Sequence, residues 1–196
     1  YWEQADGVLA QQEGGDAPVA RVQGRLWLGR VYDEIGEWDA ATARFKQAFD
    51  EAKQVGDGRS QAEALMRLGA ILLKRNQWDA ALRLYEQSLQ LYMAHDDQQG
   101  IARVHTHIGN IYSFRGQWSH AQRSYEISLN IAHELDDIAL IADVSINLGN
   151  VALAEGSEEA AIQYYENSSR RQKQIGNTYG IALSMLNLGV VYERTE

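Results

Sequence analysis

The chain has 196 residues, of which 45% are hydrophobic and 23% are charged, with a net charge of −9 and no cysteine. This composition excludes a disulfide framework and thiolate chemistry, and its negative charge argues against nucleic acid as the principal partner, because phosphate binding needs a basic surface. The longest apolar runs are short and interrupted by charge, so no segment has the pattern of a membrane span.

Five glycines recur at a spacing of forty residues. A leucine or isoleucine precedes each of them, and in four of the five periods an alanine follows at twelve residues and an aromatic residue at sixteen. A small residue and a ring four positions apart lie on one face of a helix. The spacing therefore predicts a tandem array of similar helical units. The glycines are Gly29, Gly69, Gly109, Gly149 and Gly189, the alanines Ala41, Ala81, Ala121 and Ala161, and the rings Phe45, Tyr85, Tyr125 and Tyr165.

Apolar residues fall three and four apart on both sides of a short break in each unit, which predicts two helices per unit. In chain order, we expect the second helix of a truncated unit at 1–13, full units at 21–57, 58–97, 98–137 and 138–177, and a first helix without its mate at 178–196. The residues 1–196 are thus expected to form one array. Pro18, the one proline, lies outside these expected units.

Both ends of the expected array indicate that more of the polypeptide adjoins it. Leu186, Val190 and Val191 of the last helix lack partners in this scheme, so we expect further repeats or a capping neighbour there. Because the chain opens with Tyr1 rather than methionine, we expect it to be part of a longer polypeptide.

The predicted turns also recur. Residues that adopt left-handed backbone easily stand at the break within each unit and at the turn between units. In the turns between units, the following residue has a side chain suited to capping the next helix. The breaks are Gly36-Glu37, Asn76-Gln77, Gly116-Gln117 and Gly156-Ser157, and the turns between units are Gly56-Asp57, Asp96-Asp97, Asp136-Asp137 and Gly176-Asn177.

The pattern Leu28-Gly29-x-x-Tyr32 followed by Ala41-x-x-x-Phe45 resembles the tetratricopeptide repeat signature. The unit is longer than the usual repeat of about 34 residues and lacks its terminal proline. It is similar to the longer-repeat branch that includes kinesin light chain, the Pins/LGN adaptors, bacterial CHAT-associated arrays and MalT-like regulators. The resemblance implies an all-α fold, a right-handed superhelical solenoid of antiparallel helix pairs.

The resemblance further implies that the first helices line a concave groove. It places the ligand-facing positions six and two residues before each recurring glycine and one, four and five after it. The predicted groove residues are Trp27, Arg30, Glu63, Arg67, Lys74, Arg103, His107, Asn110, Phe114, Asp143, Asn147, Asn150 and Asn187.

A basic centre stands out among the predicted groove residues. Arg67, Lys74, Arg103 and His107 face only one acid, Glu63, a setting that could receive a carboxylate. The alternative is that Glu63 and Arg67, four residues apart on one helix, pair with each other.

Four asparagines form a second group: Asn110, Asn147, Asn150 and Asn187. Their amides can hydrogen-bond the backbone of an extended peptide whatever its side chains. Solvated polar surface and bonding between helices are the alternatives.

No catalytic constellation is expected. His105 and His107 are two residues apart on a helix and point in different directions, so they do not form a metal-ligand pair. The recurring glycines lie inside helices without a following Lys-Ser/Thr, so they do not form a phosphate loop. We therefore expect neither catalytic residues, nor a metal, nor a cofactor.

These features predict a non-enzymatic scaffold in the cytoplasm that binds a peptide or protein segment in its groove. Acidic segments are among the expected partners. Nucleic acid and membrane are not expected as partners. The alternative is a sensory module of a larger MalT-like regulator, in which the array binds a small effector. The domains that adjoin the chain decide between the two.

Overall fold

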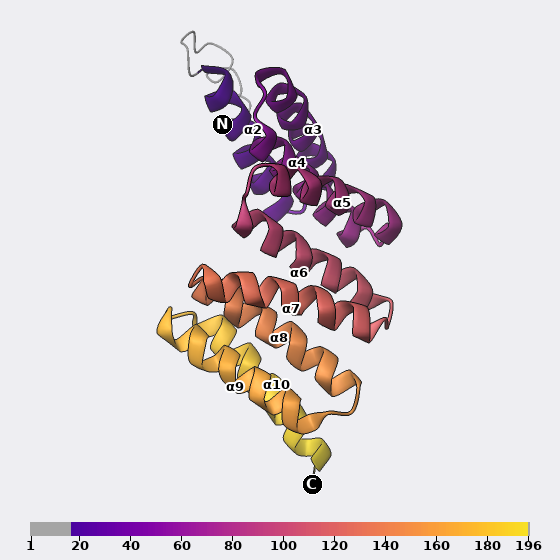
Figure 1. Cartoon of the computed structure of the whole chain (residues 1–196), viewed down its shortest axis with the longest axis vertical. Helices are drawn as coiled ribbons and strands as arrows, with labels where there is room; N and C mark the ends of the chain where they lie inside the picture. The colour runs from indigo at the N-terminus through magenta and orange to yellow at the C-terminus, as the bar shows by residue number, and fades with distance from the viewer. Residues whose placement is uncertain (1–16, 196) are drawn as a thin grey trace. The chain divides into compact units, whose positions relative to one another are not determined.

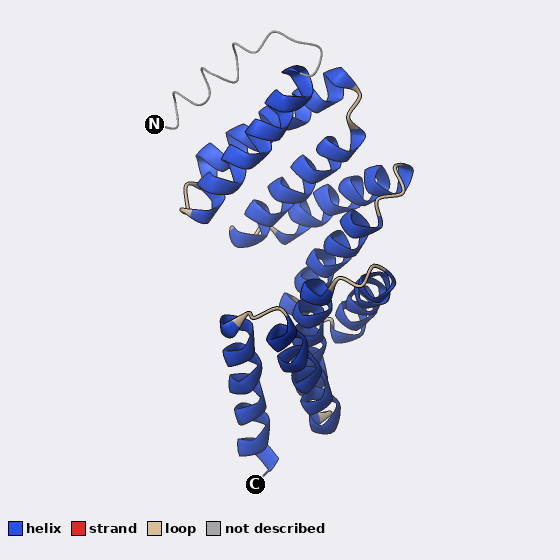
Figure 2. Cartoon of the chain, turned by 90° about the vertical axis from the view of Figure 1, so that its left-hand side faces the viewer, coloured by secondary structure: helices blue, strands red, loops and turns tan. Residues whose placement is uncertain are grey.

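The computed structural model describes residues 17–195, and every regular element in that range is an α-helix (Figures 1 and 2). The helices are α2 (Ala17–Glu34), α3 (Trp38–Val55), α4 (Gly58–Lys74), α5 (Trp78–Ala94), α6 (Gln98–Phe114), α7 (Trp118–Glu134), α8 (Ile138–Ala154), α9 (Glu158–Gln174) and α10 (Thr178–Thr195). The all-α class is confirmed. The helix expected at 1–13 lies outside the described residues.

The turns have the backbone that their sequence predicts. Asn76, Asp96 and Asp136 have φ angles of 58°, 50° and 51°, and the glycines at the equivalent turns are also left-handed. At the turns between units, the next side chain accepts a hydrogen bond from the backbone N–H three residues on, as Asp57 does from Ser60 at 3.0 Å. Asp97, Asp137 and Asn177 make the same bond at 2.8, 3.0 and 3.1 Å. Each such bond contributes about 1 kcal/mol and fixes where the helix begins.

The chain divides into two compact units, residues 1–100 and residues 101–196. In the first unit α2 packs on α3 and α4 on α5, and in the second α8 packs on α9. The paired helices are antiparallel, because contacting residues are farther apart in sequence the farther they lie from the turn. Gly69 lies against Tyr85 near the α4–α5 turn, whereas the Ala62 carbonyl accepts a hydrogen bond from Ser88, 26 residues away.

The core of each helix pair is an aromatic ring placed over a recurring glycine. A Cβ atom on Gly109 would stand 2.5 Å from Cε1 of Tyr125, and one on Gly149 would stand 2.5 Å from Cε1 of Tyr165. Gly69 meets Tyr85 in the same way, at 2.7 Å, and Gly29 meets Phe45. The four rings are at most 2% exposed. Glycine is needed at these positions because the ring occupies the space of a side chain.

Gly189 is the exception, with no atom within 4 Å of its would-be Cβ. No second helix follows α10 among the described residues, so no ring covers this glycine. Leu186 and Val190 on the same helix are 65% and 40% exposed. These two residues are exposed, as expected.

Two expectations about single residues are wrong. Val191 is fully buried, because it faces back toward α8 and α9 and packs in a cluster with Ala161 and Tyr165. Pro18 lies within the first turn of α2 rather than outside the helices. The first turn tolerates proline because its N–H groups have no partner within the helix.

Replacing Gly109 by leucine should lower the free energy of unfolding by about 2 kcal/mol or more, because the new side chain would overlap the Tyr125 ring. The matched control is Gly189→Leu, which meets no atom and removes the helix-propensity cost of glycine, about 1 kcal/mol. Urea denaturation followed by circular dichroism measures both variants. Equal effects at the two positions would show that the ring contact does not set the need for glycine.

Deleting residues 138–177, one whole period, should leave a folded helical protein of lower stability. The deletion joins α10 to the end of α7, and Leu188-Gly189 then stands where Leu148-Gly149 stood. Stability should fall because a repeat array is stabilised by contacts between neighbours. Circular dichroism and a thermal melt test this, and an unfolded deletion variant would refute a modular array.

Candidate binding surface

The basic residues predicted for the groove have acidic partners in the first unit. Lys74 Nζ lies 2.6 Å from Asp33 Oδ1, and Arg67 Nη2 lies 3.5 Å from Glu63 Oε1. The expectation that Glu63 alone opposes this basic centre is therefore wrong in this unit, because Asp33 on α2 reaches Lys74 on α4. Partly exposed pairs of this kind contribute about 0–1 kcal/mol each.

The remaining predicted groove residues of the first unit lie on α2. Trp27 is 45% exposed and Arg30 is half-buried. In the second unit Arg103 and His107 are half-buried on α6, while Phe114 at the end of that helix is 63% exposed.

Two of the four asparagines bond to the second helix of their own pair. The Tyr125 hydroxyl donates to Asn110 Oδ1 at 2.7 Å, and the Tyr165 hydroxyl donates to Asn150 Oδ1 at 2.8 Å. Burial raises the pKa of Tyr165 to about 12, so its hydroxyl stays protonated and remains a donor at neutral pH. Bonding between helices is thus confirmed for Asn110 and Asn150, and each bond fixes the orientation of the amide.

The other polar groove positions of the second unit lie on α8 and α10. Asp143 Oδ1 accepts a hydrogen bond from Nε2 of the buried Gln172 at 3.1 Å. Partial burial raises the pKa of Asp143, and the hydrogen bond from Gln172 acts in the opposite direction. Asn147 and Asn187 are half-buried.

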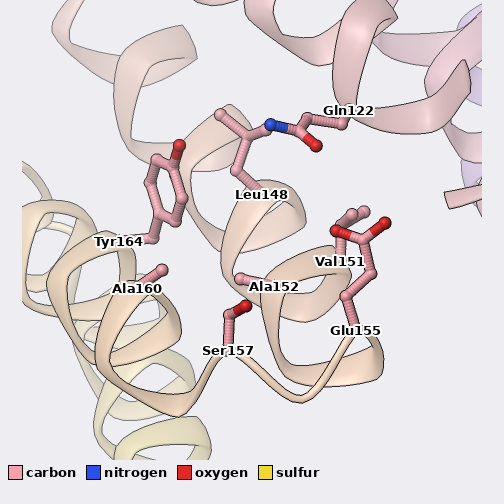
Figure 3. A pocket seen from close by; sticks show the side chains of 8 residues that line it. All are labelled: Gln122, Leu148, Val151, Ala152, Glu155, Ser157, Ala160 and Tyr164. Atoms are coloured by element: carbon pink, nitrogen blue, oxygen red, sulfur yellow. The ribbon is translucent and has the colours of Figure 1, made fainter. Parts of the chain in front are cut away.

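Cavities lie elsewhere on the described part of the two units, among them the following three. One of about 360 Å³ lies among α3, α4 and α5, one of about 120 Å³ among α7, α8 and α9, and one of about 470 Å³ between α9 and α10. Figure 3 shows the second of these, with Tyr164 on one side and Glu155 on the other. None of the predicted groove residues lines any of the three.

Sequence analysis missed these cavities, although the sequence holds a signal for them. Leu68 and Ile71 line the first cavity, and Leu148 and Val151, eighty residues on, line the second. A cavity therefore forms at the same position of the repeat in both units. The apolar pattern by itself identifies its lining residues only as core residues.

Two kinds of site are not found among residues 17–195. No group of three or more histidine, aspartate or glutamate side chains in that range could hold a metal ion. None of the helices described there is both long and apolar enough to cross a bilayer.

The repeated helix pairs, with one glycine–ring contact in each, define a helical tandem-repeat protein. The tetratricopeptide repeat family matches residues 18–94 and 60–134, and a second form of the same repeat matches residues 142–174. The chain belongs to the tetratricopeptide repeat family.

Solved structures with this fold include BtubC (BKLC) from P. vanneervenii, with a TM-score of 0.73, 22% identity, and coverage of 89% of this chain and 72% of that one. The apo form of RapI has a TM-score of 0.83 at 14% identity, and the similarity covers 97% of this chain and 69% of RapI. A Rap protein complexed with Competence and Sporulation Factor has a TM-score of 0.77 at 15% identity, and this chain spans 52% of its length. At these identities the similarity shows the fold alone. None of the curated proteins matches the chain.

Replacing Asn150 by alanine should lower the free energy of unfolding by about 1 kcal/mol, because the buried Tyr165 hydroxyl loses its acceptor. In a Tyr165→Phe background the same replacement should cost close to nothing. Phe45 occupies the equivalent position in the first unit, which shows that the site accepts a ring without a hydroxyl. A double-mutant cycle from urea denaturation measures the coupling, and equal costs in both backgrounds would contradict it.

Proposed function

We propose that this chain is a non-enzymatic scaffold that binds an extended segment of a partner protein along its first helices. One observation carries the proposal: Asn110 and Asn150 stand one residue after successive recurring glycines, and a tyrosine hydroxyl holds each Oδ1 atom. Each amide keeps two N–H donors in a fixed orientation. An extended segment offers a carbonyl acceptor at every residue, so recurring amide donors suit its backbone.

The charges on the first helices support a partner that carries acidic groups. Arg103 is a half-buried cation on α6, and its guanidinium can bind a carboxylate through two parallel hydrogen bonds. In the first unit, an incoming carboxylate would compete with Glu63 for Arg67 and with Asp33 for Lys74.

The proposed contact residues are the predicted groove residues, taken unit by unit. In the first unit they are Trp27, Arg30, Glu63, Arg67 and Lys74, and in the second Arg103, His107, Asn110, Phe114, Asp143, Asn147, Asn150 and Asn187. The exposed rings of Trp27 and Phe114 supply apolar contact area next to the polar groups.

The comparisons are in keeping with a binding role. One structure with this fold is a complex with Competence and Sporulation Factor, so a related array holds a partner. We place the scaffold in the cytoplasm, in keeping with the absence of cysteine.

Peptides selected from a displayed random library against the full chain provide the probe. Replacing Asn110 and Asn150 by alanine should weaken binding of the selected peptides at least tenfold, about 1.4 kcal/mol, by isothermal titration calorimetry. The control replaces Asn130 and Asn167, which lie on the second helices α7 and α9. A thermal melt of each variant confirms that it is folded at the titration temperature. Equal affinities for the two double variants would refute binding along the first helices.

A further inference from the structure

The cavity of the first unit has an apolar floor. Leu68, Ile71 and Leu72 of α4 and Leu84 of α5 line it, and its volume is about 360 Å³. Thr42 adds no free hydroxyl donor, because that hydroxyl donates to the Trp38 carbonyl at 2.7 Å. A space of this size and polarity accepts one bulky apolar side chain.

The rim of this cavity is basic. Lys46 of α3 and Arg75, at the end of α4, both line it. Arg75 Nη2 lies 2.6 Å from Asp39 Oδ1, and Asp39 is 95% exposed, so a solvated acid is the present partner of this guanidinium. Since exposed pairs are weak, an anion at the rim can take the place of Asp39.

The second unit has an equivalent cavity, and the charged residue that lines it is an acid, Glu155 (Figure 3). Eighty residues after Arg75 stands Glu155, which lines that cavity, and eighty after Lys46 stands Glu126. Glu126 Oε1 accepts a hydrogen bond from Gln122, another lining residue, at 2.8 Å. Burial raises the pKa of Tyr164, and the nearby Glu126 carboxylate raises it further. Glu126 therefore lies near two residues that line this cavity, although it does not line the cavity itself.

The two cavities share a floor pattern and differ in the sign of their rims. Leu148 and Val151 stand at the positions of Leu68 and Ile71. Glu155 lines the second cavity at the position of Arg75, and the position of Lys46 is also an acid, Glu126. Helix pairing requires the apolar positions but places no demand on the rim. The basic rim thus distinguishes the cavity of the first unit from its equivalent in the second unit, in a chain of net charge −9.

We propose that the cavity of the first unit binds the C-terminal residue of a partner polypeptide. A leucine, isoleucine or phenylalanine side chain fills the apolar floor, and the terminal carboxylate lies against Lys46 and Arg75. The C-terminal residue is the one place in a protein where a bulky apolar side chain and a carboxylate share a single residue. The site uses none of the predicted groove residues, so it is independent of the proposed function.

The probe is acetyl-Gly-Gly-Leu with a free C-terminus, titrated into the full chain by calorimetry. The same peptide with a C-terminal amide should bind at least tenfold more weakly, because it carries no charge for the two cations. N-acetyl-leucine, which lacks the peptide, should bind more weakly than the tripeptide acid. Equal affinities for acid and amide, or no binding of the acid at millimolar concentration, would overturn the proposal. Equal binding of N-acetyl-leucine would overturn the assignment to a polypeptide terminus.

Three variants of the first unit test the contacts. Lys46→Glu with Arg75→Glu introduces the acids found at the equivalent positions of the second unit and should abolish binding of the acid. Asp39→Asn should strengthen it, because Asp39 competes for Arg75. Leu84→Tyr copies Tyr164, the equivalent lining residue of the smaller cavity, and should weaken it.

The matched control is Arg83→Glu with Arg123→Glu, which changes the net charge by the same amount at exposed positions of α5 and α7. It should leave the affinity within twofold of the wild type, and a loss equal to that of the rim variant would show a mere effect of net charge.

Circular dichroism melts confirm the fold of every variant. Library-selected peptides whose binding is weakened by the Asn110 and Asn150 replacements should bind the rim variant as before, which separates failure of this site from failure of the proposed scaffold.

Discussion

The contact between a recurring glycine and the ring sixteen residues later sets the distance between the two helices of a unit. At Gly149 the Tyr165 ring occupies the space of a side chain, and the hydroxyl of the same tyrosine reaches Asn150 on the next residue. The orientation of the asparagine amide therefore depends on how closely the helices approach. One tyrosine thus both packs on the glycine and orients an amide that we propose as a contact for a partner.

Differences between repeats supply the specificity that the common fold cannot, since a fold by itself does not determine a ligand. The residue after the glycine is Arg30, Ala70, Asn110 or Asn150 in successive periods, while the helix pairing stays the same. The cavity rims vary in the same way, with Arg75 in one unit and Glu155 in the other. Each repeat can change its exposed groups independently, because its core is formed by the glycine, the alanine, the ring and the other buried apolar residues.

Much of the fold could be predicted from the sequence, because turns, caps and the glycine spacing are local features. The candidate site could be predicted less well. Positions for the groove came from the repeat, but the partner of Lys74 is Asp33, 41 residues earlier, and nothing in the spacing identified it. Val191 was expected to lack a partner and is buried, because helix rotation decides which of two neighbouring apolar residues faces the core.

The sequence by itself determined the period, the class and the helix ends. These follow from backbone preferences within a few residues and from a pattern repeated along the chain. Only the tertiary structure decided which charges neutralise one another and where the helices leave a cavity. Ion pairs such as Lys74 with Asp33, and a space lined by Lys46, Leu68 and Leu84, arise between helices. Their existence depends on distances that packing sets and that no local pattern encodes.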